Sequence, residues 1–134
     1  MIKRRELWDG VKSLLNKSNI LIKDKDNSEH YYWGRNCQGW RLIDENDFAV
    51  IEEEMPPHTY EKLHFHKYAK QLFYIIDGIA EFEVTDKKYK VYANQSFYIK
   101  PGLKHRIYNS TNKPLKFIVI SQPSVKNDRF EQDK

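Results

Sequence analysis

Two histidines separated by a single residue, His64 and His66, are the side chains in this sequence whose types and spacing best suit chemistry. In an extended segment, residues i and i+2 point to the same face of the strand, so both imidazoles point the same way. Imidazole binds Zn, Fe, Ni and Cu. Taken alone, the pair is as typical of two half-buried polar side chains without a functional role as it is of a metal site. Gln71 and His105, which follows the turn Pro101-Gly102, favour the metal.

Gln71 can join the histidines only if the chain turns between them. It lies five residues after His66, an odd separation that would place it on the opposite face of one continuous strand. We therefore expect residues 67–70 to lead the chain into a partner strand. The result is an apolar cavity with a few convergent polar groups, which is typical of a small-molecule site. The side chains expected to face it are His64, His66, Gln71, Phe73, Ile75, Ala80, Phe82, Val84, Phe97, Ile99, His105 and Ile107.

Short strand-like runs must position these residues. Turn signals such as Pro56-Pro57, Asp77-Gly78 and Asn112-Lys113-Pro114 separate most of the runs. Many short strands at such spacing predict an all-β sandwich or barrel. The predicted strands cover residues 47–55, 60–66, 71–77, 79–85, 88–93, 95–100, 104–110 and 115–121.

The flanking segments read differently. Residues 6–16 have the apolar spacing of a short amphipathic helix, and residues 23–30 are polar enough for a loop. The aromatic stretch 31–42 contains two glycines and predicts strands that bend sharply at both. The polar tail, residues 122–134, is expected either to fray or to lie on the surface. We expect one domain over residues 1–134, with its core at about 45–121 and an N-terminal helix and strand extension over 1–44.

Composition narrows the function classes. The chain has 134 residues, of which 40% are hydrophobic, as in an ordinary globular domain. Its net charge of +4 comes from 23 basic and 19 acidic residues that are scattered, so we expect no nucleic-acid partner. Cys37 is the single cysteine, which excludes an intrachain disulfide. The sequence has no apolar run of membrane-spanning length and no signal-peptide core, and we expect a cytoplasmic protein without a membrane partner.

The two histidine motifs together resemble those of the cupin superfamily. Its first motif reads G-x5-H-x-H, three or four residues, E, six residues and G, and its second reads G-x5-P-x-G-x2-H-x3-N. The matching residues here are His58, His64, His66, Gln71 and Gly78, then Asn94, Pro101 (one place late), Gly102, His105 and Asn109. The resemblance covers about residues 45–121. It implies a double-stranded β-helix, or jelly roll, with a metal in the mouth of the barrel.

Three departures from the motifs bear on this expectation. Gln71 stands where most cupins have a glutamate ligand, and His58 and Asn94 stand where they have glycines. Three neutral imidazoles and a neutral amide leave the +2 charge of a metal uncompensated. We expect weaker metal retention, a stronger Lewis acid and a preference for an anionic substrate. Gln71 is either the fourth ligand or a hydrogen-bonding neighbour of a three-histidine site, and loss of the metal is the third alternative.

The resemblance implies a metal-dependent enzyme. His64, His66 and His105 would hold a divalent transition metal (Fe, Mn, Ni or Zn), with Gln71 as the fourth residue of the site. The substrate would be a small molecule, and dioxygenase, isomerase and lyase chemistry are all compatible with this site. Two alternatives stay open. One is a non-catalytic cupin that senses or binds a sugar or small acid, and the other is a metal-free sugar-nucleotide isomerase or epimerase that uses a histidine as base.

Four other residues are less decisive. Glu61 would serve as a general base only if it faced the cavity, and a surface position is expected instead. His58 is either a further histidine of the cavity or an exposed turn residue after Pro56-Pro57, and the turn is expected. Arg41 either holds an anionic group at the mouth or covers Trp40 on the surface. Cys37 is expected to be a buried structural thiol.

Four apolar side chains are predicted to face outward from the sheets. So many outward apolar residues suggest a covered surface, and we expect a homodimer. The four are Tyr74, Ile76, Tyr92 and Tyr98.

Overall fold

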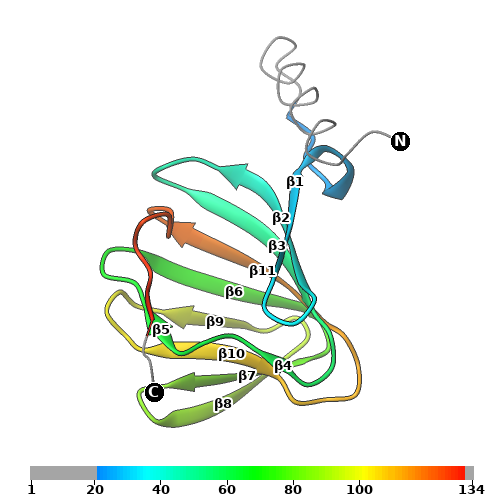
Figure 1. The fold of residues 1–134 in the computed structure, drawn as a ribbon, viewed down its shortest axis with the longest axis vertical. Helices are drawn as coiled ribbons and strands as arrows, with labels where there is room; N and C mark the ends of the chain where they lie inside the picture. The colour runs from blue at the N-terminus through cyan, green and yellow to red at the C-terminus, as the bar shows by residue number, and fades with distance from the viewer. Residues whose placement is uncertain (1–20, 132–134) are drawn as a thin grey trace.

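The computed structural model describes residues 21–131, which form two β-sheets packed face to face (Figure 1). The first sheet has the strand order β1-β2-β3-β11-β6-β9, and the second has the order β12-β5-β10-β7-β8, with β4 also paired to β10. All pairs are antiparallel, so the predicted all-β jelly roll is confirmed. The strands are β1 (Glu29–Trp33), β2 (Cys37–Asp44), β3 (Ala49–Met55), β4 (Thr59–Tyr60), β5 (His64–Phe65), β6 (Lys70–Asp77), β7 (Ile79–Val84), β8 (Lys87–Tyr92), β9 (Ser96–Ile99), β10 (His105–Asn109), β11 (Leu115–Gln122) and β12 (Phe130–Glu131).

Alternating side chains build the core between the two sheets. In β7, Ala80, Phe82 and Val84 are buried, whereas the glutamates between them face outward. Phe82 lies at the centre, with its ring 5.0 Å from that of Phe73 on the opposite sheet. This period of two is what a strand with one buried face requires, and it confirms the predicted parity of the inner walls.

Strand pairing brings the predicted site residues together. His64 in β5 is paired directly with His105 at the start of β10. The turn expected at residues 67–70 is present, and β6 begins at Lys70. Gln71 then lies opposite Ser121 of β11 and faces the interior. The histidines and Gln71 therefore come from the two sheets and face each other across the barrel.

The strand predicted over 60–66 is wrong, because the chain there forms the two short strands β4 and β5 with a break between them. Tyr60 pairs with Tyr108 and His64 pairs with His105, so four steps along this segment match three steps along β10. One extra residue on one strand interrupts the ladder, as in a β-bulge. The parity of side chains changes across the break, with a consequence for Glu61 described below.

The N-terminal part agrees only in places with the prediction. The helix expected at 6–16 lies outside the described residues, and a 3-10 turn, η1 (Lys25–Asn27), follows the N-cap Asp24. β1 and β2 form a hairpin that turns at Gly34, as predicted. The prediction of a sharp bend at Gly39 is wrong. Gly39 lies in the middle of β2, where a Cβ atom would sit 2.2 Å from Cζ of Tyr31.

The C-terminal tail makes more contacts with the barrel than predicted. Residues after Gln122 return along β5, where β12 pairs with it (Figure 1). Ser124 and Asp128 are buried rather than laid on the surface. Within residues 21–131, no helix is long and apolar enough to cross a membrane.

Candidate metal centre

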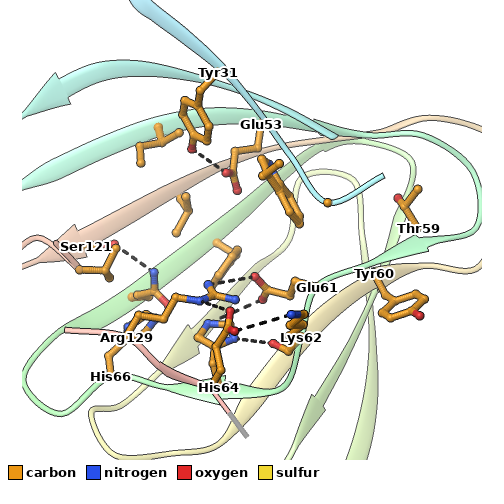
Figure 2. A pocket seen from close by; sticks show the side chains of 18 of the residues that line it. Tyr31, Glu53, Thr59, Tyr60, Glu61, Lys62, His64, His66, Ser121 and Arg129 are labelled. Atoms are coloured by element: carbon orange, nitrogen blue, oxygen red, sulfur yellow. Dashed lines mark hydrogen bonds and ion pairs between the residues drawn. The ribbon is translucent and has the colours of Figure 1, made fainter. Parts of the chain in front are cut away.

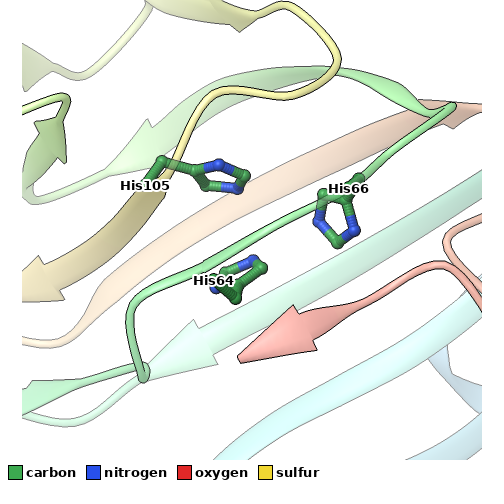
Figure 3. Close-up of side chains that lie close together, drawn as sticks. All are labelled: His64, His66 and His105. Atoms are coloured by element: carbon green, nitrogen blue, oxygen red, sulfur yellow. The ribbon is translucent and has the colours of Figure 1, made fainter. Parts of the chain in front are cut away.

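Three histidines converge at one end of the barrel (Figure 3). One ring nitrogen from each of His64, His66 and His105 lies within 4.8 Å of the others. All three side chains are buried, with at most 3% of their surface exposed. They come from β5, from the residue just after it, and from the first position of β10. The predicted histidine cluster is therefore formed by the fold.

Hydrogen bonds fix the orientation of each ring. Nδ1 of His64 donates to the carbonyl of Lys62 (2.7 Å), and Nδ1 of His105 donates to that of Leu103 (2.8 Å). Nδ1 of His66 donates to the carbonyl of Asp128 (2.6 Å). A neutral imidazole that donates through Nδ1 keeps its lone pair on Nε2, which is the form that binds metals.

The Nε2 atoms are left to face the interior. Among residues 21–131, the buried Nε2 atoms of His66 and His105 have no hydrogen-bond partner. Buried polar atoms normally have a partner, so such orphaned atoms need an explanation. A bound metal supplies one.

The electrostatics keep these rings neutral. Burial, with a smaller effect from the neighbouring His105, lowers the pKa of His64 to about 2. Burial likewise lowers the pKa of His105 to about 4 and that of His66 below its ordinary value. Because metal binding requires the unprotonated imidazole, all three rings are ready to bind at neutral pH.

Gln71 faces the same site from the opposite sheet. Its Nε2 donates to Oγ of Ser121 at 3.1 Å, which fixes the orientation of the amide. Its Oε1 is buried and, within the described part of the chain, has no hydrogen-bond partner. The amide also interacts with His66, whose pKa it raises against the larger effect of burial. Three imidazole nitrogens and one unpaired amide oxygen suit a divalent transition metal.

Glu61 lies inside the cavity, so the expected surface position is wrong. Its Oε1 accepts from the amide of Ile107 (3.1 Å) and lies 4.0 Å from Nε2 of His64 (Figure 2). Its Oε2 lies 3.7 Å from Nη1 of Arg129. Burial raises the pKa of Glu61 to about 8. The extra residue between β4 and β5 turns this side chain inward, and a hydrophobicity pattern carries no signal for it.

A cavity of about 640 Å³ opens beside the histidines. Its walls combine apolar side chains with arginines and three glutamates, Glu53, Glu61 and Glu131 (Figure 2). Arg41 lines it, with the guanidinium carbon 4.2 Å from the ring centroid of Tyr31. The cation over Trp40 is instead Lys25, at 4.3 Å, so the surface alternative for Arg41 was wrong. The lining residues that matter below are Tyr31, Arg41, Glu53, Glu61, His64, His66, Gln71 and Arg129.

Glu53 is the second acid of the cavity. It accepts a hydrogen bond from the hydroxyl of Tyr31 at 2.9 Å. Burial raises its pKa to about 7, although the hydrogen bond from Tyr31 acts in the opposite direction. Burial of the phenol raises the pKa of Tyr31, and the nearby Glu53 carboxylate raises it to a smaller extent.

Two minor predictions hold. His58 has a positive φ of 59° in an exposed turn, where its Nε2 makes a 2.8 Å hydrogen bond with Asn112, and it also lines the edge of the cavity. Cys37 is a fully buried free thiol whose pKa is raised by burial. Neither the histidine cluster nor the cavity depends on a reactive cysteine.

Two residues of the C-terminal tail reach the site, although the sequence did not predict it. Asp128 holds the ring of His66 through its carbonyl, and Arg129 points into the cavity beside Glu61 (Figure 2). Asp128 and Arg129 lie in a polar stretch with little periodicity, which gave no signal that they reach the site.

Comparisons with known proteins agree with this geometry. The model of the Cupin domain family matches residues 51–121, more than half of the chain. An uncharacterized protein of Methanocaldococcus jannaschii is 28% identical over 83 residues, which cover 62% of this chain and 66% of that protein. The chain thus spans just under two thirds of that relative's length.

Solved structures share the fold at low identity. A predicted oxalate decarboxylase from Thermotoga maritima has a TM-score of 0.68 at 19% identity, covering 77% of this chain and 99% of its own. A sugar phosphate isomerase from Silicibacter pomeroyi has a TM-score of 0.71 at 16% identity, and the match covers 84% of this chain and 82% of the isomerase. The polyketide cyclase RemF from Streptomyces resistomycificus has a TM-score of 0.66 at 17% identity, and the match covers 77% of this chain and 79% of RemF.

Proposed function

This chain belongs to the Cupin domain family, and we propose that it is a metal-dependent enzyme acting on a small anionic molecule. His64, His66 and His105 would hold a divalent transition metal, with Oε1 of Gln71 as a fourth ligand. The observation that carries the proposal is the set of buried acceptor atoms described above. Each imidazole donates through Nδ1, and two Nε2 atoms and the amide oxygen lack a partner among residues 21–131.

The metal would supply Lewis-acid polarisation of a substrate oxygen. Fe, Mn, Ni and Zn all accept a site of imidazole nitrogens and an amide oxygen, so the donor set admits each of them. Because all four protein ligands are neutral, the substrate itself is the natural source of negative charge. This favours a carboxylate or a comparable oxyanion over a neutral molecule.

The cavity supports an anionic substrate from its other walls. Arg41 and Arg129 both line it and supply positive charge. Two of the structural neighbours are named for anionic compounds, oxalate and a sugar phosphate. We propose that an arginine of the cavity pairs with the substrate's anionic group while its other oxygen approaches the histidine site.

Glu61 favours proton-transfer chemistry over dioxygenation. A carboxyl with a pKa near neutrality is suited to accept and return a proton, as isomerases and lyases require. Oε1 of Glu61 lies 4.0 Å from Nε2 of His64, so a substrate at the site would come within its reach. A metal-free reaction with a histidine base is disfavoured, because the pKa values of His64 (about 2) and His105 (about 4) make both rings weak bases.

We also propose that two copies of the chain pair through the outer face of the first sheet. Val50, Ile120, Leu72 and Tyr98 lie opposite one another across β3, β11, β6 and β9 and form one apolar row. Tyr74 and Ile76 extend it, each with 40% of its surface exposed. A continuous apolar face of this kind is typical of a covered surface.

The reaction class is tested by incubating protein reconstituted with Fe(II), Mn, Ni or Zn with small anions in deuterated water. The panel would include oxalate, hydroxy acids and sugar phosphates. We expect deuterium incorporation by NMR, reduced about 10²–10⁴-fold in Glu61→Gln, which keeps its shape but cannot accept the proton. Oxygen consumption without exchange would indicate a dioxygenase instead. A rise in melting temperature with neither reaction would contradict the enzyme proposal and indicate a binding protein.

A further inference from the structure

The three histidines are not oriented in the same way. His64 and His105 each donate through Nδ1 to a carbonyl two residues earlier in their own segment. His66 donates instead to Asp128, which is 62 residues away in the sequence. Two of the rings are therefore oriented locally, whereas the third depends on a remote segment being in place.

Asp128 also binds the chain next to His66 through its side chain. Its Oδ1 accepts from the amide of Lys67 (2.7 Å), and its Oδ2 accepts from those of Tyr68 (3.0 Å) and Ala69 (2.9 Å). These three amides belong to the turn between His66 and β6. A carboxylate that accepts several backbone amides makes charge-assisted hydrogen bonds, which are stronger than neutral ones. With 5% of its surface exposed, Asp128 makes these bonds away from competing water.

Further contacts hold the C-terminal segment on the same strand. β12 pairs with β5 through Phe130 opposite Phe65 and Glu131 opposite His64. The rings of Phe65 and Phe130 are stacked with centroids 5.2 Å apart. The segment 123–131 lies outside the stretch matched by the Cupin domain family, yet in Figure 1 it descends directly onto β5.

We propose that Asp128 is a positioning residue that docks segment 123–131 and thereby fixes the tautomer and direction of the His66 ring. Asp128 holds both the ring of His66 and the backbone that follows it, since its carbonyl accepts from Nδ1 and its carboxylate accepts from the amides of the turn. The histidine site is complete only when this segment is docked. The proposed effect on metal affinity rests on the proposed function, whereas the effect on the ring does not.

The experiment compares Asp128→Ala with Asn109→Ala. Asn109 is the matched control, because it is a buried polar side chain that likewise binds backbone groups, donating to the carbonyls of Met55, Pro56 and Lys113. The first readout is the tautomer of each histidine in the metal-free protein, from ¹H–¹⁵N correlation spectra of the ring nitrogens. In Asp128→Ala we expect His66 to shift from the Nδ1–H form toward the Nε2–H form, with His64 and His105 unchanged.

The second readout is the affinity for Zn²⁺, measured by competition with a chromophoric chelator. Loss of a group that orients a metal ligand typically weakens metal binding by about 10–100-fold, and we expect this range for Asp128→Ala. Asn109→Ala should lose thermal stability but keep the wild-type affinity. Asp128→Asn, which retains the shape and part of the hydrogen bonding, should fall between the two and remains informative if Asp128→Ala folds poorly.

An unchanged His66 tautomer in a folded Asp128 variant would overturn the inference, as would equal losses of affinity in the Asp128 and Asn109 variants. If the tautomer shifts as expected but wild-type protein binds no zinc or other divalent metal, the positioning role stands and the proposed metal function fails. The two failures are therefore distinguishable.

Discussion

At Gln71 a neutral amide stands beside three neutral imidazoles, and this residue determines how strongly the site would retain a metal. Substituting Gln71→Glu adds a negative charge at the unpaired Oε1 position, and the hydroxyl of Ser121, which accepts from Nε2 of Gln71, can donate instead to the other carboxylate oxygen. We expect metal affinity to rise about tenfold or more, which corresponds to at least about 1.4 kcal/mol.

Gln71→Met provides the control, since it preserves the volume of the side chain but removes the oxygen. Isothermal titration with Zn²⁺ and Mn²⁺ measures both variants. If Oε1 is a ligand, Gln71→Met binds more weakly than wild type. Equal affinity in all three proteins would show that residue 71 does not coordinate the metal.

Glu53 gives the site a pH dependence at the residue scale. Its pKa of about 7 in the folded protein exceeds the ordinary value of 4.5, so the folded state binds this proton more tightly than the unfolded state. The contribution of Glu53 to stability is therefore fully present below pH 4.5 and is lost as the pH rises through about 7. Because the carboxyl is only half-buried, we expect a loss of about 1–2 kcal/mol, less than the full shift implies.

Urea unfolding at pH 5 and pH 8 measures this loss as a difference between wild type and Glu53→Gln, because the histidines with lowered pKa values add stability over the same pH range in both proteins. Glu53→Gln should lose less stability than wild type between these two pH values, whereas Glu45→Gln, at an exposed loop position, should behave as wild type does. Identical pH profiles for wild type and Glu53→Gln would contradict the assignment.

The residues of the candidate site divide by how they could be found. His64, His66, Gln71 and His105 were predictable, because motif spacing and strand parity act over a few residues. Glu61 and Asp128 were not. The first faces inward because of one extra residue opposite β10, and the second acts from a distant segment with no periodic pattern.

At the scale of elements, the break between β4 and β5 explains how a polar residue enters an otherwise apolar wall. The predicted uninterrupted strand would have kept Glu61 out of phase with His64 and His66. Instead the backbone amide of Glu61 donates to Ile107, and the side chain accepts from the amide of the same residue. The strand boundaries elsewhere agree with the prediction to within about two residues, since alternation and turn residues define them locally.

The β1–β2 hairpin positions Tyr31 over the cavity, and Gly39 makes this possible. A Cβ at residue 39 would fall 2.2 Å from Cζ of Tyr31, so Gly39→Ala must displace the ring and weaken its hydrogen bond to Glu53. We expect a loss of about 1–3 kcal/mol in the free energy of unfolding, as for other overpacked sites.

A double-mutant cycle separates this cause from a general effect of alanine in a strand. In the Tyr31→Ala background the ring is absent, and Gly39→Ala should be nearly neutral. Chemical denaturation of the four proteins measures the coupling. Equal costs of Gly39→Ala in both backgrounds would show that the Tyr31 ring is not the obstacle.

At the scale of the molecule, the outer face of the first sheet predicts a dimer. Leu72→Lys places a charge in the apolar row formed with Val50, Ile120 and Tyr98, and should convert a dimer into a monomer. Tyr92→Lys, at an exposed position on β8 of the second sheet, is the control and should leave the mass unchanged. Sedimentation velocity measures both. A monomeric wild-type protein at micromolar concentration would contradict the prediction.

The jelly roll could be predicted from sequence because its strands are short, regular and separated by clear turns. The docking of the C-terminal segment could not, since it depends on the single buried carboxylate of Asp128 and on two residues of β12 rather than on a hydrophobic pattern. The molecule thus completes its candidate site with a segment beyond the part matched by the family.

Metal content tests the central claim most directly. Untagged protein, purified without chelator and reconstituted in turn with Fe(II), Mn, Ni and Zn, would be analysed by inductively coupled plasma mass spectrometry beside the double variant His64→Ala, His66→Ala. We predict one metal ion per chain in the wild type and essentially none in the variant, whose circular dichroism should remain that of the folded barrel. A wild type that retains no stoichiometric metal in any reconstitution, or a variant with the same metal content, would contradict the account.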